Sequence, residues 1–152
     1  MTASSVQRIP LQVVRGCVVA SIQVDLDPEV LRQFRNDLLE CVKNSNANGV
    51  ILDVSGVDVL DLEDFNGLRS TMEMAEVMGA RSILSGLKPG VVSALIDLGA
   101  DPEGVNAVLN LDDAFQLLEG IQEKSARAEQ IIDDGHESSD DEQKPNADPG
   151  QG

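Results

Sequence analysis

The chain has 152 residues, 41% of them hydrophobic but only 2% aromatic, and a formal net charge of -16. This length and composition predict one ordinary domain with a core of aliphatic side chains. The negative charge argues against nucleic acid and against anionic membrane surfaces as partners, because proteins bind both through basic residues. A protein partner with a basic face fits this charge better.

Signals for export or for a membrane span are also missing from the sequence. No apolar stretch approaches the roughly 20 residues that cross a bilayer. The first residues, "MTASSVQRIP", lack the basic and apolar regions of a signal peptide. We therefore expect a cytoplasmic protein.

Two runs rich in β-branched residues open the chain, at residues 9–14 and 16–22. Their close spacing predicts a β-hairpin. Asp27 and Pro28 then predict a helix start, since aspartate caps helix N-termini and proline suits the first helical position. Apolar residues recur behind them at helical spacing, so an amphipathic helix is expected to run to the polar "NSNANG".

Residues 50–54 are a short apolar run typical of a buried strand, and a loop follows it. The next helix is predicted from about Leu62 to Gly79, because glycine suits a helix end. The sequence then predicts a strand at residues 80–86 and a short helix at 91–99. A short strand at 105–110 and a last helix at 112–121, capped by Asn110 or Asp112, follow. Strands joined by single helices require parallel pairing with right-handed crossovers, which predicts an α/β fold.

The composition changes at about Ser125. Residues 125–152 are rich in acidic, glycine, proline and serine residues and contain almost no apolar residue after Ile132. Low hydrophobicity together with like charge predicts a disordered acidic tail. We therefore expect a folded domain over residues 1–124 and a tail over 125–152, the first few residues of which could extend the last helix.

Evidence for an enzyme is poor. The single histidine, His136, falls in the predicted tail, where general acid-base chemistry has no rigid scaffold. Neither GxxxxGK[ST] nor GxGxxG occurs, and "SGLKPG" is better explained as a turn than as a phosphate cradle. We expect no catalytic activity, no cofactor and no metal.

Asp53 ends an apolar strand and in this respect resembles the phosphoacceptor of a response-regulator receiver. In a receiver, however, that aspartate follows the third parallel strand and two helices. Only one helix is predicted before Asp53, and no acidic pair follows the first strand. An aspartyl-phosphate receiver is therefore kept only as an alternative.

A cluster of acidic residues follows this strand and comprises Asp58, Asp61, Glu63 and Asp64. Its spacing does not match a calcium loop, which alternates oxygen ligands around a central glycine and closes with a bidentate glutamate. Helix capping explains it better: Asp61 is expected to be the N-cap, and the next two acids face the positive end of the helix dipole.

Four stretches together resemble one known family: "RIPLQVVRGCVVASIQVDLD", "ANGVILDVSGVDVLDLEDF", "MAEVMGARSILSGLKPGVVSALIDLGAD" and "AVLNLDDAFQLLEG". They are similar to the STAS domain of anti-sigma factor antagonists, most closely to its stressosome scaffold branch in the sigma-B stress pathway. The likeness runs from about Arg8 to Gly120. It implies a small mixed sheet of four to five strands flanked by helices.

The resemblance implies a non-enzymatic regulator that binds and sequesters a serine/threonine switch kinase. Members of this branch look like scaffolds that co-assemble with STAS sensor paralogues, and with themselves, into a large particle of a stress-response pathway. An alternative within the family is a module that senses a small ligand or nucleotide, although the sequence has few aromatics and no phosphate loop.

In this family the phosphorylated serine follows an aspartate at the start of the second helix. An ungapped placement puts Asp61 and Leu62 at these two positions, and a two-residue gap puts Glu63 and Asp64 there. Neither placement supplies a hydroxyl. The ungapped one keeps the apolar helix face in register, so Leu62 is the expected equivalent of the phosphosite.

Nearby hydroxyls are candidates for accessory phosphorylation sites: Ser55, Ser70 and Thr71. They are better explained as a loop residue and two residues on a helix surface. The partner-binding surface is expected to combine the start of the second helix with the loop beside it: Asp58, Asp61, Leu62, Glu63, Asp64, Asn66, Ser85, Gly86, Leu87 and Lys88.

Overall fold

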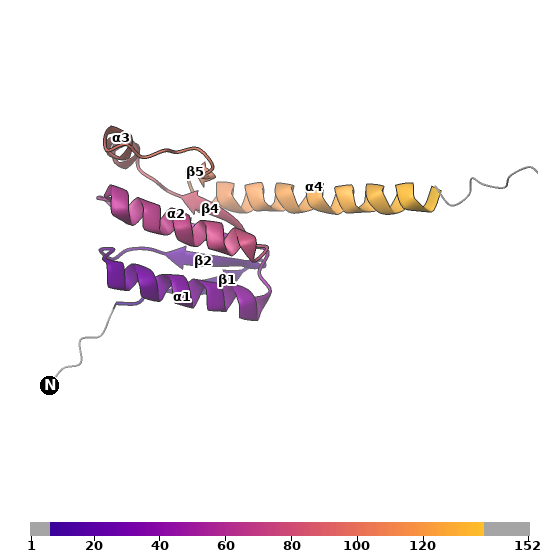
Figure 1. Ribbon diagram of the computed structural model, residues 1–152, viewed down its shortest axis with the longest axis horizontal. Coiled ribbons are helices and arrows are strands. Elements are labelled where there is room, and N and C mark those ends of the chain that lie inside the picture. The colour runs from indigo at the N-terminus through magenta and orange to yellow at the C-terminus, as the bar shows by residue number, and fades with distance from the viewer. Residues whose placement is uncertain (1–6, 139–152) are drawn as a thin grey trace, which may run out of the picture. The chain divides into compact units, whose positions relative to one another are not determined.

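The computed structural model describes residues 7–138, and Figure 1 shows the path of the chain. Five strands and four helices lie in this part, in the order that the sequence predicts. The α/β fold with a small mixed sheet is therefore confirmed. In chain order the elements are β1 (Leu11–Val14), β2 (Cys17–Ser21), α1 (Pro28–Ser45), β3 (Gly49–Asp53), α2 (Leu62–Val77), β4 (Arg81–Ser85), α3 (Pro89–Asp97), β5 (Ala107–Val108) and α4 (Leu111–Ser138).

The sheet has the simple strand order β1-β2-β3-β4-β5. β1 is antiparallel to β2, as expected for the predicted hairpin, and the other neighbouring pairs are parallel. Right-handed crossovers between strands in this order place the connecting helices on the same face. α1 and α2 accordingly lie side by side along one face of the sheet (Figure 1).

The core has two parts, one on each face of the sheet. The larger part packs residues such as Phe34, Leu38 and Leu68 of α1 and α2 against Val50 and Leu52 of β3. The smaller part lies on the other face and joins Ile51 and Ile83 to Ala114 and Leu118 of α4. Successive side chains of one strand thus pack on opposite faces of the sheet, as the pleated backbone requires.

Side-chain hydrogen bonds cap the starts of α1 and α4. Asp27 accepts a hydrogen bond from the Val30 N–H at 2.9 Å, and Pro28 is the first residue of α1. Asn110 caps α4 by accepting from the Asp113 N–H, also at 2.9 Å. These contacts confirm the predicted caps and resolve the choice at the start of α4 in favour of Asn110.

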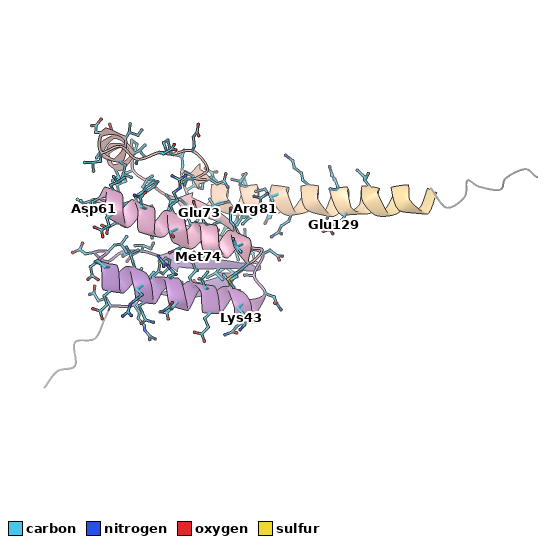
Figure 2. All side chains as sticks on the ribbon, viewed as in Figure 1. Lys43, Asp61, Glu73, Met74, Arg81 and Glu129 are labelled. Atoms are coloured by element: carbon cyan, nitrogen blue, oxygen red, sulfur yellow. The ribbon has the colours of Figure 1, made fainter. Side chains whose placement is uncertain are left out.

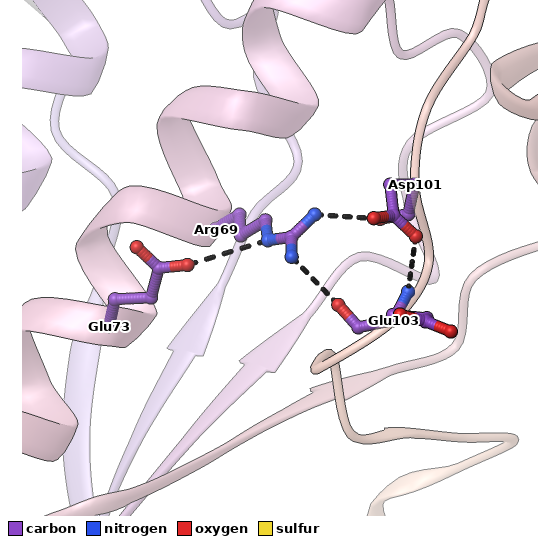
Figure 3. A network of polar contacts seen from close by, with 4 residues as sticks. All are labelled: Arg69, Glu73, Asp101 and Glu103. Atoms are coloured by element: carbon purple, nitrogen blue, oxygen red, sulfur yellow. Dashed lines mark hydrogen bonds and ion pairs between the residues drawn. The ribbon is translucent and has the colours of Figure 1, made fainter.

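Arg69 of α2 holds the segment between α3 and β5 (Figure 3). Its two Nη atoms donate to the carbonyl oxygens of Asp101 and Glu103, both at 2.7 Å, and its Nε lies 3.4 Å from Glu73 Oε1. A planar guanidinium can make such a forked contact, which a lysine cannot reproduce. One side chain therefore joins a helix to a loop more than thirty residues away in sequence.

The chain divides into two compact units, one up to Leu118 and one from Glu119 onward. Helix α4 continues to Ser138, so it extends past Ser125 over more than the first few residues that the sequence suggested. Ala126, Ala128 and their neighbours are good helix formers, and their helix propensity outweighs the acidic composition here. Residues 139–152 lie outside the described residues.

None of the helices between residues 7 and 138 combines the length and the apolar character that a membrane span requires.

Candidate functional site

The carboxyl ends of the parallel strands form the edge of the sheet where this site is built. β3 ends at Asp53 and β4 ends at Ser85, and the two residues are partners in the parallel register. The loop after β3 leads into α2, and the turn after β4 leads into α3. In open α/β sheets this edge is where ligands bind, because loops and helix N-termini converge there.

The start of α2 is set by Asp61, whose position at the N-terminal end of the helix is visible in Figure 2. Its Oδ1 accepts a hydrogen bond from the Asp64 N–H at 2.7 Å, which confirms the predicted N-cap. Leu62 is the first helical residue and is half-buried, and Glu63 beside it is exposed. The helix thus begins with an apolar side chain set among carboxylates.

Two of these carboxyls have perturbed pKa values. Burial, with the negative charge of nearby Asp61 as the second cause, raises the pKa of Asp64 from its ordinary 3.8 to about 6. Lys88 lies beside Asp58 in a hydrogen-bonded ion pair and holds the pKa of Asp58 below its usual range. Negative charge is therefore crowded at the start of α2 and partly neutralised only at Asp58.

Asp64→Asn should stabilise the fold at neutral pH but not in acid. The pKa of Asp64 is higher in the folded chain than in the unfolded chain, so ionising this residue costs stability. This cost is absent below about pH 4 and complete above about pH 6. With allowance for solvent screening, we expect a gain of about 1 kcal/mol for the variant at neutral pH, measured by urea unfolding. A gain of equal size at pH values below 4 would contradict this cause.

The structure divides the predicted partner surface by exposure. The acidic residues Asp58, Asp61 and Glu63 are exposed, and so are Asn66 and Lys88. The members that are half-buried are Leu62, Asp64, Gly86 and Leu87.

Ser85 is only 1% exposed, so its place on an open partner surface is corrected. It is the last residue of β4 and pairs with Asp53 of β3 in the parallel register.

The three hydroxyls proposed as accessory phosphosites also differ. Ser55 is exposed in the loop after β3, and Ser70 is half-buried on α2. Thr71 is fully buried, and its Oγ1 donates to the Gly67 carbonyl at 2.9 Å. The expectation that Thr71 lies on the helix surface was therefore wrong, because its helix face packs on the core.

Two cavities flank the loop between β3 and α2. One, of about 340 Å³, is lined by the segment 23–26 after β2, by residues 56–59 and by Asp64. The other, of about 320 Å³, is lined by the ends of β3 and β4 and by residues 109–112 at the start of α4. Segments 23–26 and 109–112 were missed as site residues in the sequence; the only signal for them is that each follows a parallel strand.

Asp53 does not lie in the setting of a receiver. Its Oδ1 accepts a hydrogen bond from the Ser55 N–H at 3.0 Å, which closes a local turn. The receiver fold has parallel strands in the order 2-1-3-4-5. Here the parallel strands follow in sequence order behind an antiparallel edge strand, so the receiver alternative is wrong. Within residues 7–138 no three histidine, cysteine or acidic side chains converge as in a metal site.

This fold and site define a class of protein. The chain belongs to the STAS domain family, whose model matches residues 8–114. It is homologous to proteins of the stressosome, which confirms the resemblance recognised in its sequence.

Two relatives from Bacillus subtilis illustrate the homology. RsbT co-antagonist protein RsbRA is 26% identical over 105 residues, which are 64% of this chain and 38% of that protein. RsbT co-antagonist protein RsbRB is 27% identical over 91 residues, which are 60% of this chain and 33% of that protein. The chain thus spans well under half the length of these curated relatives.

Solved structures match over more of their length. A serine-to-glutamate variant of RsbS from Moorella thermoacetica is 28% identical with a TM-score of 0.67, over 76% of this chain and 97% of that chain. A chain from a structure of the stressosome, described as a signal integration and transduction hub, is 27% identical with a TM-score of 0.66, over 74% and 98% of the two chains. The anti-sigma factor antagonist SpoIIAA, at 18% identity and a TM-score of 0.56, shares the fold.

Proposed function

We propose that this chain is a non-enzymatic, cytoplasmic STAS regulator of the stressosome type. In this proposal it assembles with itself and with STAS sensor paralogues, and it binds a serine/threonine switch kinase in a stress-response pathway. The observation that carries the proposal is the start of α2. There a capping aspartate, Asp61, is followed by Leu62. In the ungapped placement that the family resemblance favours, these two residues stand where the family has its aspartate and phosphorylated serine.

The charges around Leu62 support docking of a basic protein surface. Asp58, Asp61 and Glu63 are exposed around this half-buried apolar side chain. Complementary charge at the rim of an interface mainly steers and orients a partner, while an apolar side chain such as Leu62 contributes contact area. Since leucine has no hydroxyl, the kinase docks on this chain without phosphorylating it at residue 62.

Kinase binding is tested by gel filtration of the full chain with its cognate switch kinase, ATP and magnesium, followed by intact mass. We expect a complex without added phosphate. Leu62→Arg should weaken this complex at least ~10-fold, because a charge replaces an apolar contact and opposes the basic partner. Val77→Arg is the matched control, since Val77 is 88% exposed at the other end of the same helix.

The charge of Asp61 is tested separately from its capping role. Asp61→Asn keeps an N-cap of equal quality while it removes the negative charge, whereas Asp61→Ala also loses the cap, which costs about 1 kcal/mol. We expect Asp61→Asn to slow association with little change in stability. Unchanged binding in both Leu62→Arg and Asp61→Asn would remove this surface from the proposal.

Restoring a hydroxyl tests the placement of the phosphosite. If the ungapped placement holds, Leu62→Ser gains one phosphate from the kinase and Asp64→Ser gains none. The reverse result would favour the two-residue gap. Phosphate on the unaltered chain, mapped to Ser55, would mean that the site has moved, because Ser55 is the exposed hydroxyl among the three considered.

A further inference from the structure

A cavity at the carboxyl edge of the sheet adjoins the surface proposed for kinase docking, with which it shares Gly86, and the proposed docking leaves its interior unused. It encloses about 320 Å³, at the lower end of the range for small-molecule sites. Its polar walls are Asp53 and Ser85 from the strands and Asn110 and Asp112 from the start of α4. Leu109, which is 78% exposed, adds an apolar wall.

A row of polar residues crosses the sheet at this edge. Asp53 is the register partner of Ser21 on one side and of Ser85 on the other. Val19, Ile51 and Ile83 belong to the smaller part of the core, which packs on α4. Each of the three polar residues follows one of them by two positions, and side chains two positions apart in a strand point to the same face, so all three lie on the α4 face. The Asp53 carboxylate therefore lies between two serines, each one strand spacing away, ~4.8 Å.

The hydroxyl of Ser85 is the observation that points to a ligand. Ser85 is only 1% exposed, and among the described residues its Oγ has no hydrogen-bond partner. Such a buried group costs free energy until water or a ligand satisfies it. Ser82 on the same strand is equally buried, but its Oγ donates to the Met72 carbonyl at 3.2 Å. The unmet hydrogen bond therefore belongs to the cavity wall and not to buried serines of β4 in general.

We propose that this cavity binds a guanidinium or primary ammonium group on a short aliphatic stem. The two ionisable side chains in its lining are the carboxylates of Asp53 and Asp112, and the acidic first turn of α4 offsets the positive end of the helix dipole. N–H groups of such a ligand donate to Asp53 and to Ser85 Oγ, and Leu109 and Leu111 contact the stem. Free amines and the basic side chains of a partner protein share this chemistry.

The test titrates the full-length, ¹⁵N-labelled chain with agmatine, with no kinase present. We expect saturable shifts of the amide signals of Ser85, Gly86 and Asn110. Asp53→Asn should weaken binding at least ~10-fold, because it removes the charge, although its amide oxygen still accepts the hydrogen bond from the Ser55 N–H. Asp97→Asn, at an exposed aspartate of α3, is the matched control and should bind as the unaltered chain does.

A second titration uses a short alanine peptide with one arginine. Tighter binding of agmatine identifies a free amine as the ligand, and tighter binding of the peptide identifies a side chain of a partner protein. No saturable shift with either probe would overturn the proposal. So would equal affinity in Asp53→Asn, or binding of inorganic phosphate in place of both probes.

Two buried serines provide a readout that does not depend on the ligand. Ser85→Ala removes an unsatisfied hydroxyl and should raise Tm by ~2–4 °C, whereas Ser82→Ala loses a formed hydrogen bond and should lower Tm by a similar amount. Ser85→Ala should also weaken agmatine binding at least ~3-fold. A lowered Tm together with unchanged agmatine binding in Ser85→Ala would overturn the assignment.

Discussion

Leu118→Ala is expected to lower the free energy of unfolding by about 3 kcal/mol. Leu118 of α4 is 1% exposed and packs with Ile51 and Ile83 in the smaller part of the core. Its fit is tight, because a Cβ placed on Gly49 would lie 2.8 Å from a Leu118 Cδ. Truncation removes the buried methyl groups and leaves a cavity under the helix. Urea unfolding of the full chain measures the loss.

The neighbouring leucine is the control for this prediction. Leu117 is 40% exposed on the same helix, so Leu117→Ala should cost only about 0.5 kcal/mol. Both variants lose the same atoms and keep alanine in the helix, so the difference between them measures burial alone. Equal losses would mean that α4 does not cover this face of the sheet through Leu118.

Gly86→Ala should lower the free energy of unfolding by about 2 kcal/mol and disturb the partner surface. The backbone of Gly86 has φ +83°, which a side chain disfavours. A Cβ there would also lie 2.8 Å from Ser55 Cβ and 3.1 Å from the Ser55 backbone nitrogen. The backbone of Ser55 cannot move aside as the end of a flexible side chain can. The added Cβ would therefore force the turn after β4 and the loop after β3 apart. Urea unfolding measures the stability and gel filtration with the kinase measures the effect on binding.

Two other glycines separate the causes of that loss. Gly79 has φ +96° but open space around it, so Gly79→Ala reports the backbone strain alone. Gly90 lies in α3 with neither restriction, so Gly90→Ala should stabilise the chain by about 0.5 kcal/mol. If Gly86→Ala cost no more than Gly79→Ala, the close approach of the two loops would not contribute.

Local rules account for much of what could be predicted from the sequence. Asp27 and Asp61 act as helix caps because a short side-chain oxygen reaches the free N–H groups of the first turn, whatever the rest of the fold does. The apolar repeat of α1 and the β-branched runs of the hairpin follow from the periods of helix and strand. The family motifs depend on the same local residues, so the STAS fold was predictable as well.

Tail composition, in contrast, was a poor guide to where α4 ends. Acidic and polar residues after Ser125 predict disorder by their average character, but they include good helix formers that continue an existing helix to Ser138. Adding residues to a helix that has already formed costs less free energy than starting a new helix. A prediction from average composition does not include this difference.

By itself the sequence determined the elements, their caps and the acidic start of α2, since each of these depends on contacts between near neighbours. The parallel α/β order was predictable because strands joined by single helices allow parallel pairing with right-handed crossovers. Tertiary structure alone decided that Ser85 and Thr71 are buried. It also decided that Asp53 and Ser85 adjoin across the sheet and that residues 109–112 line a cavity together with them. The reason is that strand register and helix packing join residues some thirty positions apart, and burial of a side chain is set by these distant partners and not by its own neighbours in the chain.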